Sequence, residues 1–271
     1  MTVAADQAQP VGSPVFACDG LSIEFQTPAG PKRVLERVDL AVAAGEFVSI
    51  VGQSGTGKST LLRVLGGLER AGDGSTVLHR GKPVSGPPDG VIMVFQDYRG
   101  SLLPWRTVEK NVVLGLEGKG SAAERKEKCQ QALELVGLAD RAKDHPWRLS
   151  GGMQQRVQIA RALAVQPEVM LMDEPFGALD AMTKEQLQDE LLTVHAATGA
   201  TIVFVTHDIE EAIYLSDRVL VLADAPARVT TELAVDLPRP REQVSTKEMP
   251  EYLRLRQAAY SALRGPDHGD D

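Results

Sequence analysis

The sequence is poor in cysteine and has no long apolar run. Its two cysteines, Cys18 and Cys129, stand in unrelated contexts without metal-ligand spacing, which indicates a reducing compartment and no cysteine-based metal site. No apolar stretch approaches the roughly 20 residues that a membrane-spanning helix needs. The polar, acidic start also lacks the basic-then-apolar pattern of a signal peptide. The chain by itself is therefore predicted to be cytosolic.

Basic residues are also in deficit, with 29 Lys and Arg against 37 Asp and Glu and a formal net charge of -8. This balance argues against a general nucleic-acid coat, because such binding draws on clustered Lys and Arg. The length of 271 residues allows one large or two modest domains whose core needs no disulfide support.

The most informative segment present is a glycine-rich loop. Residues 52–59 are Gly-Gln-Ser-Gly-Thr-Gly-Lys-Ser, which fits the phosphate-binding pattern G-x-x-x-x-G-K-[ST] directly after an apolar strand, Phe47–Val51. The glycines permit a turn that brings several N–H groups onto phosphate oxygens, and Lys58 can lie along the β- and γ-phosphates. Apolar spacing at 60–68 predicts a helix whose N-terminus favours anions. The alternative is an ordinary glycine-rich turn.

Strands alternate with helices in the second half, which predicts a parallel sheet wrapped by helices. The predicted elements there are helices at 153–165, 181–197 and 209–215 and strands at 169–172, 201–205 and 218–222. The first half adds short strands at 21–25 and 34–42, a strand at 91–95 expected to be buried on both faces, and a charged helical insertion at 108–138.

Polar residues follow three of the predicted strands. Asp173 and Glu174 follow one strand, and Gln96 and His207 each follow another. Because parallel strands end at one edge of a sheet, these side chains are expected to share a crevice with the loop. Asp173, Gln96 and the hydroxyl of Ser59 would hold Mg²⁺, Glu174 would act as general base, and His207 would orient the attacking water. Taken singly, each residue has a plainer interpretation as a helix cap or a satisfied polar group.

A second anion-binding helix N-terminus is expected at residues 149–156, Leu-Ser-Gly-Gly-Met-Gln-Gln-Arg, where Ser150 and two glycines open the helix. One chain then has two such sites but only one phosphate-binding loop. An economical arrangement is a head-to-tail homodimer in which each copy lends this segment to the other's nucleotide, closing with ATP and loosening after hydrolysis.

Together these segments resemble the nucleotide-binding subunit of ATP-binding cassette (ABC) transporters, over about residues 16–222. The resemblance identifies the loop at 52–59 as Walker A, Gln96 as the Q-loop, 149–153 as the signature, 169–174 as Walker B, 178–180 as the D-loop and His207 as the switch histidine. It implies an α/β P-loop ATPase with an antiparallel β subdomain and a helical subdomain at about 100–165, and it implies ATP and Mg²⁺ as cofactors.

The resemblance also assigns the nucleotide contacts. Phe25 stands where many relatives stack a Tyr on adenine. The expected contacts within one copy are Phe25, Gly52, Gln53, Ser54, Gly55, Thr56, Gly57, Lys58, Ser59 and Thr60. The contacts expected from the second copy, or from a paired ATPase subunit in its place, are Leu149, Ser150, Gly151, Gly152, Met153 and Asp180.

A finer resemblance, at 86–96, 102–112 and 235–241, is to the importers of nitrate, taurine and aliphatic sulfonates. It implies an integral membrane permease that contacts the Gln96–Asn111 region, a solute-binding protein that acts indirectly, and a peripheral position on the cytoplasmic face of the membrane. The spacing between Gln96 and Leu102 is slightly longer than in many relatives. This difference lies in the expected interface, so it affects which permease the chain can bind. Trp105 is either an anchor of that interface or a residue that stabilises a local turn.

The expected organisation is a flexible segment at 1–15, an ABC ATPase domain at 16–237 and a tail at 238–271 that ends in a short helix. Two other functions stay open from the residues alone: a soluble ABC ATPase acting on DNA or the ribosome, and a P-loop kinase of a small metabolite. The transported substrate is not encoded in the chain, because selectivity belongs to its partners.

Overall fold

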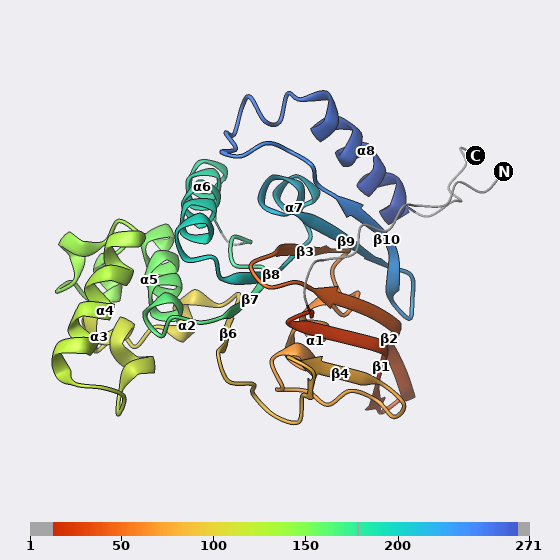
Figure 1. Ribbon diagram of the computed structural model, residues 1–271, viewed down its shortest axis with the longest axis horizontal. Coiled ribbons are helices and arrows are strands. Elements are labelled where there is room, and N and C mark those ends of the chain that lie inside the picture. The colour runs from red at the N-terminus through yellow and green to blue at the C-terminus, as the bar shows by residue number, and fades with distance from the viewer. Residues whose placement is uncertain (1–12, 178, 265–271) are drawn as a thin grey trace.

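The computed structural model describes residues 13–177 and 179–264. Most of the segment expected to be flexible, 1–15, lies outside these residues. Figure 1 shows helices α6, α7 and α8 on one side of a central sheet, strands β1, β2 and β4 with helix α1 on the other, and helices α3, α4 and α5 beside it. This is the mixed α/β architecture with a β subdomain and a helical subdomain that the resemblance implied.

The small sheet is antiparallel and lies near the N-terminus. Strands β1 (Phe16–Thr27) and β2 (Gly30–Val42) form a long hairpin, and β4 (Thr76–His79) and β5 (Lys82–Pro83) complete the order β2-β1-β4-β5. Phe16, Cys18, Leu21 and Ile23 of β1 are buried, and the residues between them are half-buried or exposed, so one face of the hairpin closes a core and the other meets solvent. The hairpin extends the two short strands predicted from the sequence.

The central sheet has six strands in the order β10-β9-β3-β8-β7-β6. Strands β3 (Phe47–Val51), β6 (Val91–Val94), β7 (Val169–Asp173), β8 (Thr201–Thr206) and β9 (Arg218–Ala223) are parallel, as predicted. Strand β10 (Arg228–Ala234) pairs antiparallel with β9 and was not predicted. The expectation that the strand at 91–95 is buried on both faces is wrong: β6 lies at the edge of the sheet and has three half-buried residues.

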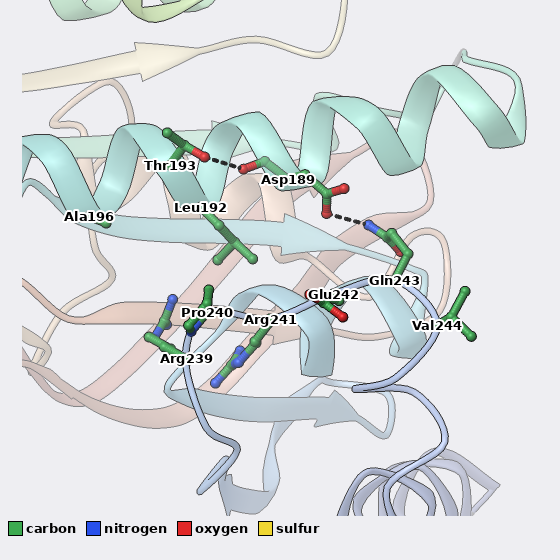
Figure 2. Close-up of a pocket in the computed structure, with 10 residues that line it drawn as sticks. All are labelled: Asp189, Leu192, Thr193, Ala196, Arg239, Pro240, Arg241, Glu242, Gln243 and Val244. Carbon is green, nitrogen blue, oxygen red and sulfur yellow. Dashed lines mark hydrogen bonds between the residues drawn. The ribbon is translucent and has the colours of Figure 1, made fainter.

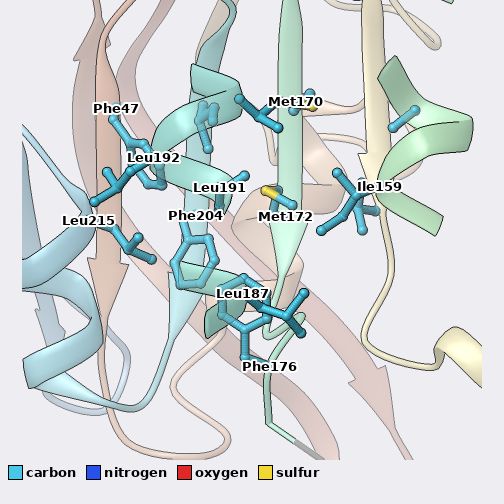
Figure 3. Packing of buried hydrophobic residues seen from close by; sticks show 14 of the residues in the cluster. Phe47, Ile159, Met170, Met172, Phe176, Leu187, Leu191, Leu192, Phe204 and Leu215 are labelled. Carbon is cyan, nitrogen blue, oxygen red and sulfur yellow. The ribbon is translucent and has the colours of Figure 1, made fainter. Parts of the chain in front are cut away.

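Two cores cover the two faces of this sheet. On one face Val48 and Ile50 of β3 pack with α1 (Lys58–Leu65) and the antiparallel sheet. On the other face Phe47 packs with Phe204, Met172 and residues of α6 (Ala181–Thr198), as Figure 3 shows. Helices α7 (Ile209–Leu215) and α8 (Pro250–Arg264) also lie on this second face. Successive side chains of β3 point to opposite faces of the sheet, so α1 and α6 lie in opposite layers.

The helical subdomain contains several short helices and not one insertion helix. Its elements are α2 (Tyr98–Ser101), α3 (Val108–Val112), the 3₁₀ turn η1 (Val113–Leu116), α4 (Ala122–Leu135), the 3₁₀ turns η2 (Ala139–Arg141) and η3 (Pro146–Arg148), and α5 (Gly151–Ala164). The break before α4 has a local cause, because Gly118 and Gly120 adopt left-handed conformations and Ser121 forms a capping box with Glu124. In the described ranges, none of the helices has the length and apolarity required to span a bilayer.

Candidate active site

The carboxyl ends of β3, β8 and β7 lie in register at one edge of the sheet. Val51 is paired with Thr206, and Asp173 is paired with Val205. Residues that directly follow these strands therefore emerge side by side: the glycine-rich loop after β3, Glu174 after β7 and His207 after β8. The structure thus brings together the groups that the sequence assigned to one crevice.

The loop at 52–57 leads directly into α1. Gly55 and Gly57 have φ values of 83° and 93°, so both adopt the left-handed conformation that other residues rarely take. Helix α1 begins at Lys58 and no side chain caps its N-terminus, so the N–H groups of its first turn are not occupied by a capping residue. This arrangement fits an anion such as a nucleotide phosphate. The helix ends at Leu65, earlier than predicted, and Leu68 is 52% exposed.

Lys58 is buried inside this loop. Its Nζ donates hydrogen bonds of 2.9 Å to the carbonyl oxygens of Gly52 and Gln53 and lies 3.4 Å from Glu174 Oε1. The ammonium group is thus held between the loop and the strand end that carries the carboxylates. A cation fixed at this position can neutralise the charge of a bound triphosphate.

Ser59 and Asp173 form the part of the site that could hold a metal. The Ser59 hydroxyl donates a hydrogen bond of 2.8 Å to Asp173 Oδ1, and burial raises the pKa of Asp173, whereas the Ser59 hydrogen bond lowers it. In the part of the chain that the structure describes, no group of three or more His, Cys, Asp or Glu side chains could hold a metal by itself. One hydroxyl and one carboxylate fit Mg²⁺, which takes few protein ligands when it binds together with nucleotide phosphates.

Glu174 and His207 face each other across the strand ends. His207 Nδ1 lies 3.0 Å from Glu174 Oε2, and the Glu174 N–H donates to the carbonyl oxygen of Val205. Glu174 has a φ of 42°, a conformation that is uncommon outside glycine and that recurs at functional sites. The imidazole is about half exposed and the carboxylate is mostly buried. The pair can therefore accept a proton from a water molecule that enters from the open side.

Gln96 lies close to the turn that follows Glu174. A side chain added at Gly177 would meet Gln96 Nε2 at 3.6 Å and Glu174 Oε2 at 3.8 Å, so both groups lie close to the turn after β7. The preceding backbone is fixed by α5, because Gln158 Nε2 donates 3.0 Å to the carbonyl oxygen of Phe95. The sequence did not predict this anchor, which joins the helical subdomain to the Q-loop.

The second predicted phosphate-binding segment opens α5. Ser150 caps the helix by accepting a hydrogen bond of 3.3 Å from the Met153 N–H. Gly152 permits a close helix contact, because a Cβ at this position would lie 2.5 Å from Thr183 Cγ2 in α6. Asp180 caps α6 through the Thr183 N–H, and this hydrogen bond lowers the pKa of Asp180. The signature and the end of the D-loop are therefore packed together; Ala178, which begins the D-loop, lies outside the described residues.

Phe25 lies in β1 on the opposite side of the central sheet from α5. Its side chain is half-buried and packs against the core that contains α1, near Val34. A half-buried aromatic ring can stack with a planar ligand.

A buried asparagine organises the segment predicted to meet a permease. The Asn111 side chain is fully buried, and its Nδ2 donates to the carbonyl oxygens of Leu103, Arg106 and Thr107. Its Oδ1 accepts from the Leu103 N–H at 2.9 Å and from Arg161 at 2.7 Å. The sequence marked Asn111 only as the end of this region; its role as the hub of the loop comes from contacts that no local pattern indicates.

Comparisons with known proteins agree with this geometry. The chain matches the family model described as ABC transporter over residues 35–177. It is 43% identical to the nitrate import ATP-binding protein NrtD of Synechococcus elongatus, over 94% of this chain and 93% of that protein. It is 40% identical to the bicarbonate transport ATP-binding protein CmpD of the same organism, over 97% of this chain and 95% of that protein. A solved dimeric ATP-binding cassette in a post-hydrolysis state, bound to ADP and Pi, is 32% identical with a TM-score of 0.69, over 81% of this chain and 98% of that one.

Proposed function

Because the chain belongs to the ABC transporter family and is an ATPase, we propose that it is the motor subunit of a membrane importer for a small anion of the nitrate, bicarbonate, sulfonate or taurine kind. In this role it lies on the cytoplasmic face of the membrane, attached through a permease. The observation that carries the proposal is the convergence of Lys58, Glu174 and His207 at one edge of the sheet.

The proposed reaction is hydrolysis of the γ-phosphate. A water molecule attacks the γ-phosphorus, its proton passes to Glu174, and the bond from that phosphorus to the β,γ-bridging oxygen breaks to give ADP and phosphate. His207 holds Glu174 and the water in line, and Lys58 with the N–H groups of the loop stabilises the charge on the transferred group. Adenine stacks on Phe25.

The proposed metal site consists of Ser59, Asp173 and Gln96. Mg²⁺ held by these residues would neutralise part of the charge of the bound triphosphate. The hydrogen bond between Ser59 and Asp173 supports this assignment, since it places a hydroxyl and a carboxylate oxygen within reach of one cation.

We propose that two copies share each nucleotide. Helix α1 packs in the core on one face of the sheet and α5 packs in the core on the other, so their N-termini belong to different layers of one copy. Ser150 is exposed at the start of α5, and Asp180 is exposed at the start of α6. The exposed Ser150 and Asp180 can then bring the segment 149–153 and the start of α6 over a nucleotide that the loop of another copy holds.

The proposed permease contact is the surface around Trp105, which is 73% exposed. Nearby, Trp147 is 70% exposed and lines a cleft of about 330 Å³ together with Leu102, Pro104, Pro146, Leu149, Gly151 and Gln154. This cleft connects the loop after the Q-loop to the signature, so a partner seated there would contact both. Large exposed aromatic residues are typical anchors of such interfaces.

The test is ATP hydrolysis by the chain alone and after reconstitution with the permease encoded beside it in the genome. We expect weak hydrolysis of MgATP by the purified chain and stimulation by permease together with anion-loaded binding protein. The variant Trp105→Ala should lose most of this stimulation. Failure of any neighbouring permease to bind the chain or to change its rate would contradict the transport role and leave the soluble ABC ATPase as the better account.

A further inference from the structure

A buried polar cluster lies directly behind His207. Thr206, the residue before it, donates its hydroxyl hydrogen to Glu211 Oε2, and the Asp208 N–H donates 3.0 Å to the same hydroxyl oxygen. Gln188 of α6 donates 3.2 Å to Glu211 Oε1. The backbone on both sides of His207 is therefore tied, through one hydroxyl, to a carboxylate in the first turn of α7.

The three side chains of this cluster are almost completely buried, with exposed fractions of 2% for Thr206, 5% for Glu211 and 3% for Gln188. Burial raises the pKa of Glu211, and the hydrogen bond from Thr206 and the charge of Lys184 oppose this shift. Burying such groups removes them from water, and apolar residues of the same size are often at least as stabilising. The cluster is therefore not explained by stability alone, and its location points to a role at the strand end.

The C-terminal tail holds the far end of this cluster. Gln243 Nε2 donates to Gln188 Oε1 at 3.3 Å and to Asp189 Oδ1 at 2.8 Å, and Figure 2 shows the second of these bonds beside the cleft between α6 and the tail. The same tail holds both ends of α7. Arg241 donates to the carbonyl oxygens of Ile213, Tyr214 and Ser216, and the Tyr252 hydroxyl donates 3.0 Å to the carbonyl oxygen of Glu210.

We propose that Thr206, Glu211 and Gln188 are positioning residues for His207, and that Gln243 links them to the C-terminal tail. The inference rests on the function proposed for His207. The imidazole is half exposed, and its contact with Glu174 is 3.0 Å long. With so little packing around the ring, the position of the imidazole depends on the backbone of His207. The cluster fixes that backbone from the buried side, and the tail fixes the cluster.

The first test compares Thr206→Val with Thr206→Ser. Valine has the shape of threonine but has no hydroxyl group, whereas serine keeps the hydroxyl group. We expect Thr206→Val to lower kcat for ATP hydrolysis roughly tenfold with little change in KM, because Lys58 and the loop are untouched. Thr206→Ser should recover most of the rate. A structural defect alone would also change KM or the urea midpoint of the variant measured alongside.

The decisive comparison places Thr206→Val in a His207→Ala background, with turnover followed as phosphate release at enzyme excess. If Thr206 acts through His207, the valine substitution should change the residual rate by less than about twofold. An undiminished tenfold effect in that background would overturn the inference. If His207→Ala is slow but Thr206→Val is as fast as the parent, the inference alone fails. Normal turnover by His207→Ala would overturn both this inference and the role proposed for His207.

The tail is tested with Gln243→Leu and with Gln257→Leu as its control, since Gln257 is exposed on α8. We expect kcat to fall about threefold for Gln243→Leu and to stay unchanged for the control, with KM equal in both. Equal kcat values for the two variants would contradict the claim that Gln243 links the cluster to the C-terminal tail. Neither variant replaces Thr206, Glu211 or Gln188, so both remain informative even if Thr206→Val folds poorly.

Discussion

Replacement of Asn111 by alanine tests how the proposed permease contact is built. The Asn111 side chain makes five hydrogen bonds in a fully buried position, three to carbonyl oxygens of the loop and two from N–H groups of Leu103 and Arg161. Alanine removes all five. The loop that carries Trp105 then loses the hydrogen bonds of this side chain, while Arg161 still donates to the carbonyl oxygens of Ser101 and Asn111. No residue of the proposed catalytic pair changes.

The magnitude follows from the groups left without partners. The Leu103 N–H and one N–H of Arg161 lose a buried acceptor, at about 1–3 kcal/mol each. Alanine regains roughly 0.5 kcal/mol because it favours the helix more than asparagine does. The net loss in the free energy of unfolding is therefore about 3 kcal/mol, which corresponds to a fall in Tm of roughly 6–12 °C for a protein of this size.

The assay is thermal and urea unfolding, with Trp105→Ala as the matched control in the same loop. Because Trp105 is 73% exposed, its removal should change the free energy of unfolding by no more than about 0.5 kcal/mol. Both variants should lose stimulation of ATP hydrolysis by the permease, for different reasons. A Tm for Asn111→Ala within about 2 °C of the parent would refute the hub described for this loop.

Three further outcomes are expected. Glu174→Gln should lower ATP turnover by roughly 10²–10⁴ and leave equilibrium ATP binding intact, because it removes a general base without altering the loop; phosphate release and a binding titration measure the two effects. Gly152→Ala should destabilise the packing of α5 on α6 by about 1–3 kcal/mol, since its Cβ would lie 2.5 Å from Thr183 Cγ2; adding Thr183→Ser removes that methyl group and should restore most of the loss in urea unfolding. Asp208→Asn should cost roughly 0.5–1 kcal/mol at neutral pH. Burial opposes ionisation of Asp208, but the Lys184 hydrogen bond and the α7 N–H groups together hold the pKa of Asp208 below its ordinary value of 3.8. The stability that ionised Asp208 contributes is therefore fully present above pH 3.8 and is lost as the pH falls through its lower pKa in the folded protein. The free energies of unfolding of the parent and of Asp208→Asn should therefore converge in acid.

The sequence predicted best what depends on local pattern. The strand Phe47–Val51, the loop after it and the start of α1 follow from apolar runs and glycines that act over a few residues. Alternation of strands and helices predicted the parallel sheet, and the rule that strand ends share an edge placed Glu174 and His207 in one crevice, where the structure has them 3.0 Å apart.

What the sequence did not predict depends on distant partners. Strand β10 forms because it pairs with β9. Its residues alternate between exposed and half-buried, so no fully buried apolar run marks it as a strand in the sequence. Asn111, Thr206 and Glu211 are of residue types usually found at the surface, yet each is buried and forms hydrogen bonds with residues of other helices, strands or loops. Hydrogen bonds between segments far apart in the chain leave no periodicity, so only the folded structure reveals them.

The shared nucleotide site is the central claim, and ATP-dependent pairing of the Glu174→Gln variant tests it most directly. Slow hydrolysis should let the closed pair accumulate, so size-exclusion chromatography with light scattering should show a dimer with MgATP and a monomer with MgADP. The same variant with Ser150→Arg should still bind ATP and stay monomeric, because the arginine blocks the segment that covers the other copy's nucleotide. A Ser150→Arg protein that pairs, or that hydrolyses ATP at the parent rate when Glu174 is intact, would contradict the account.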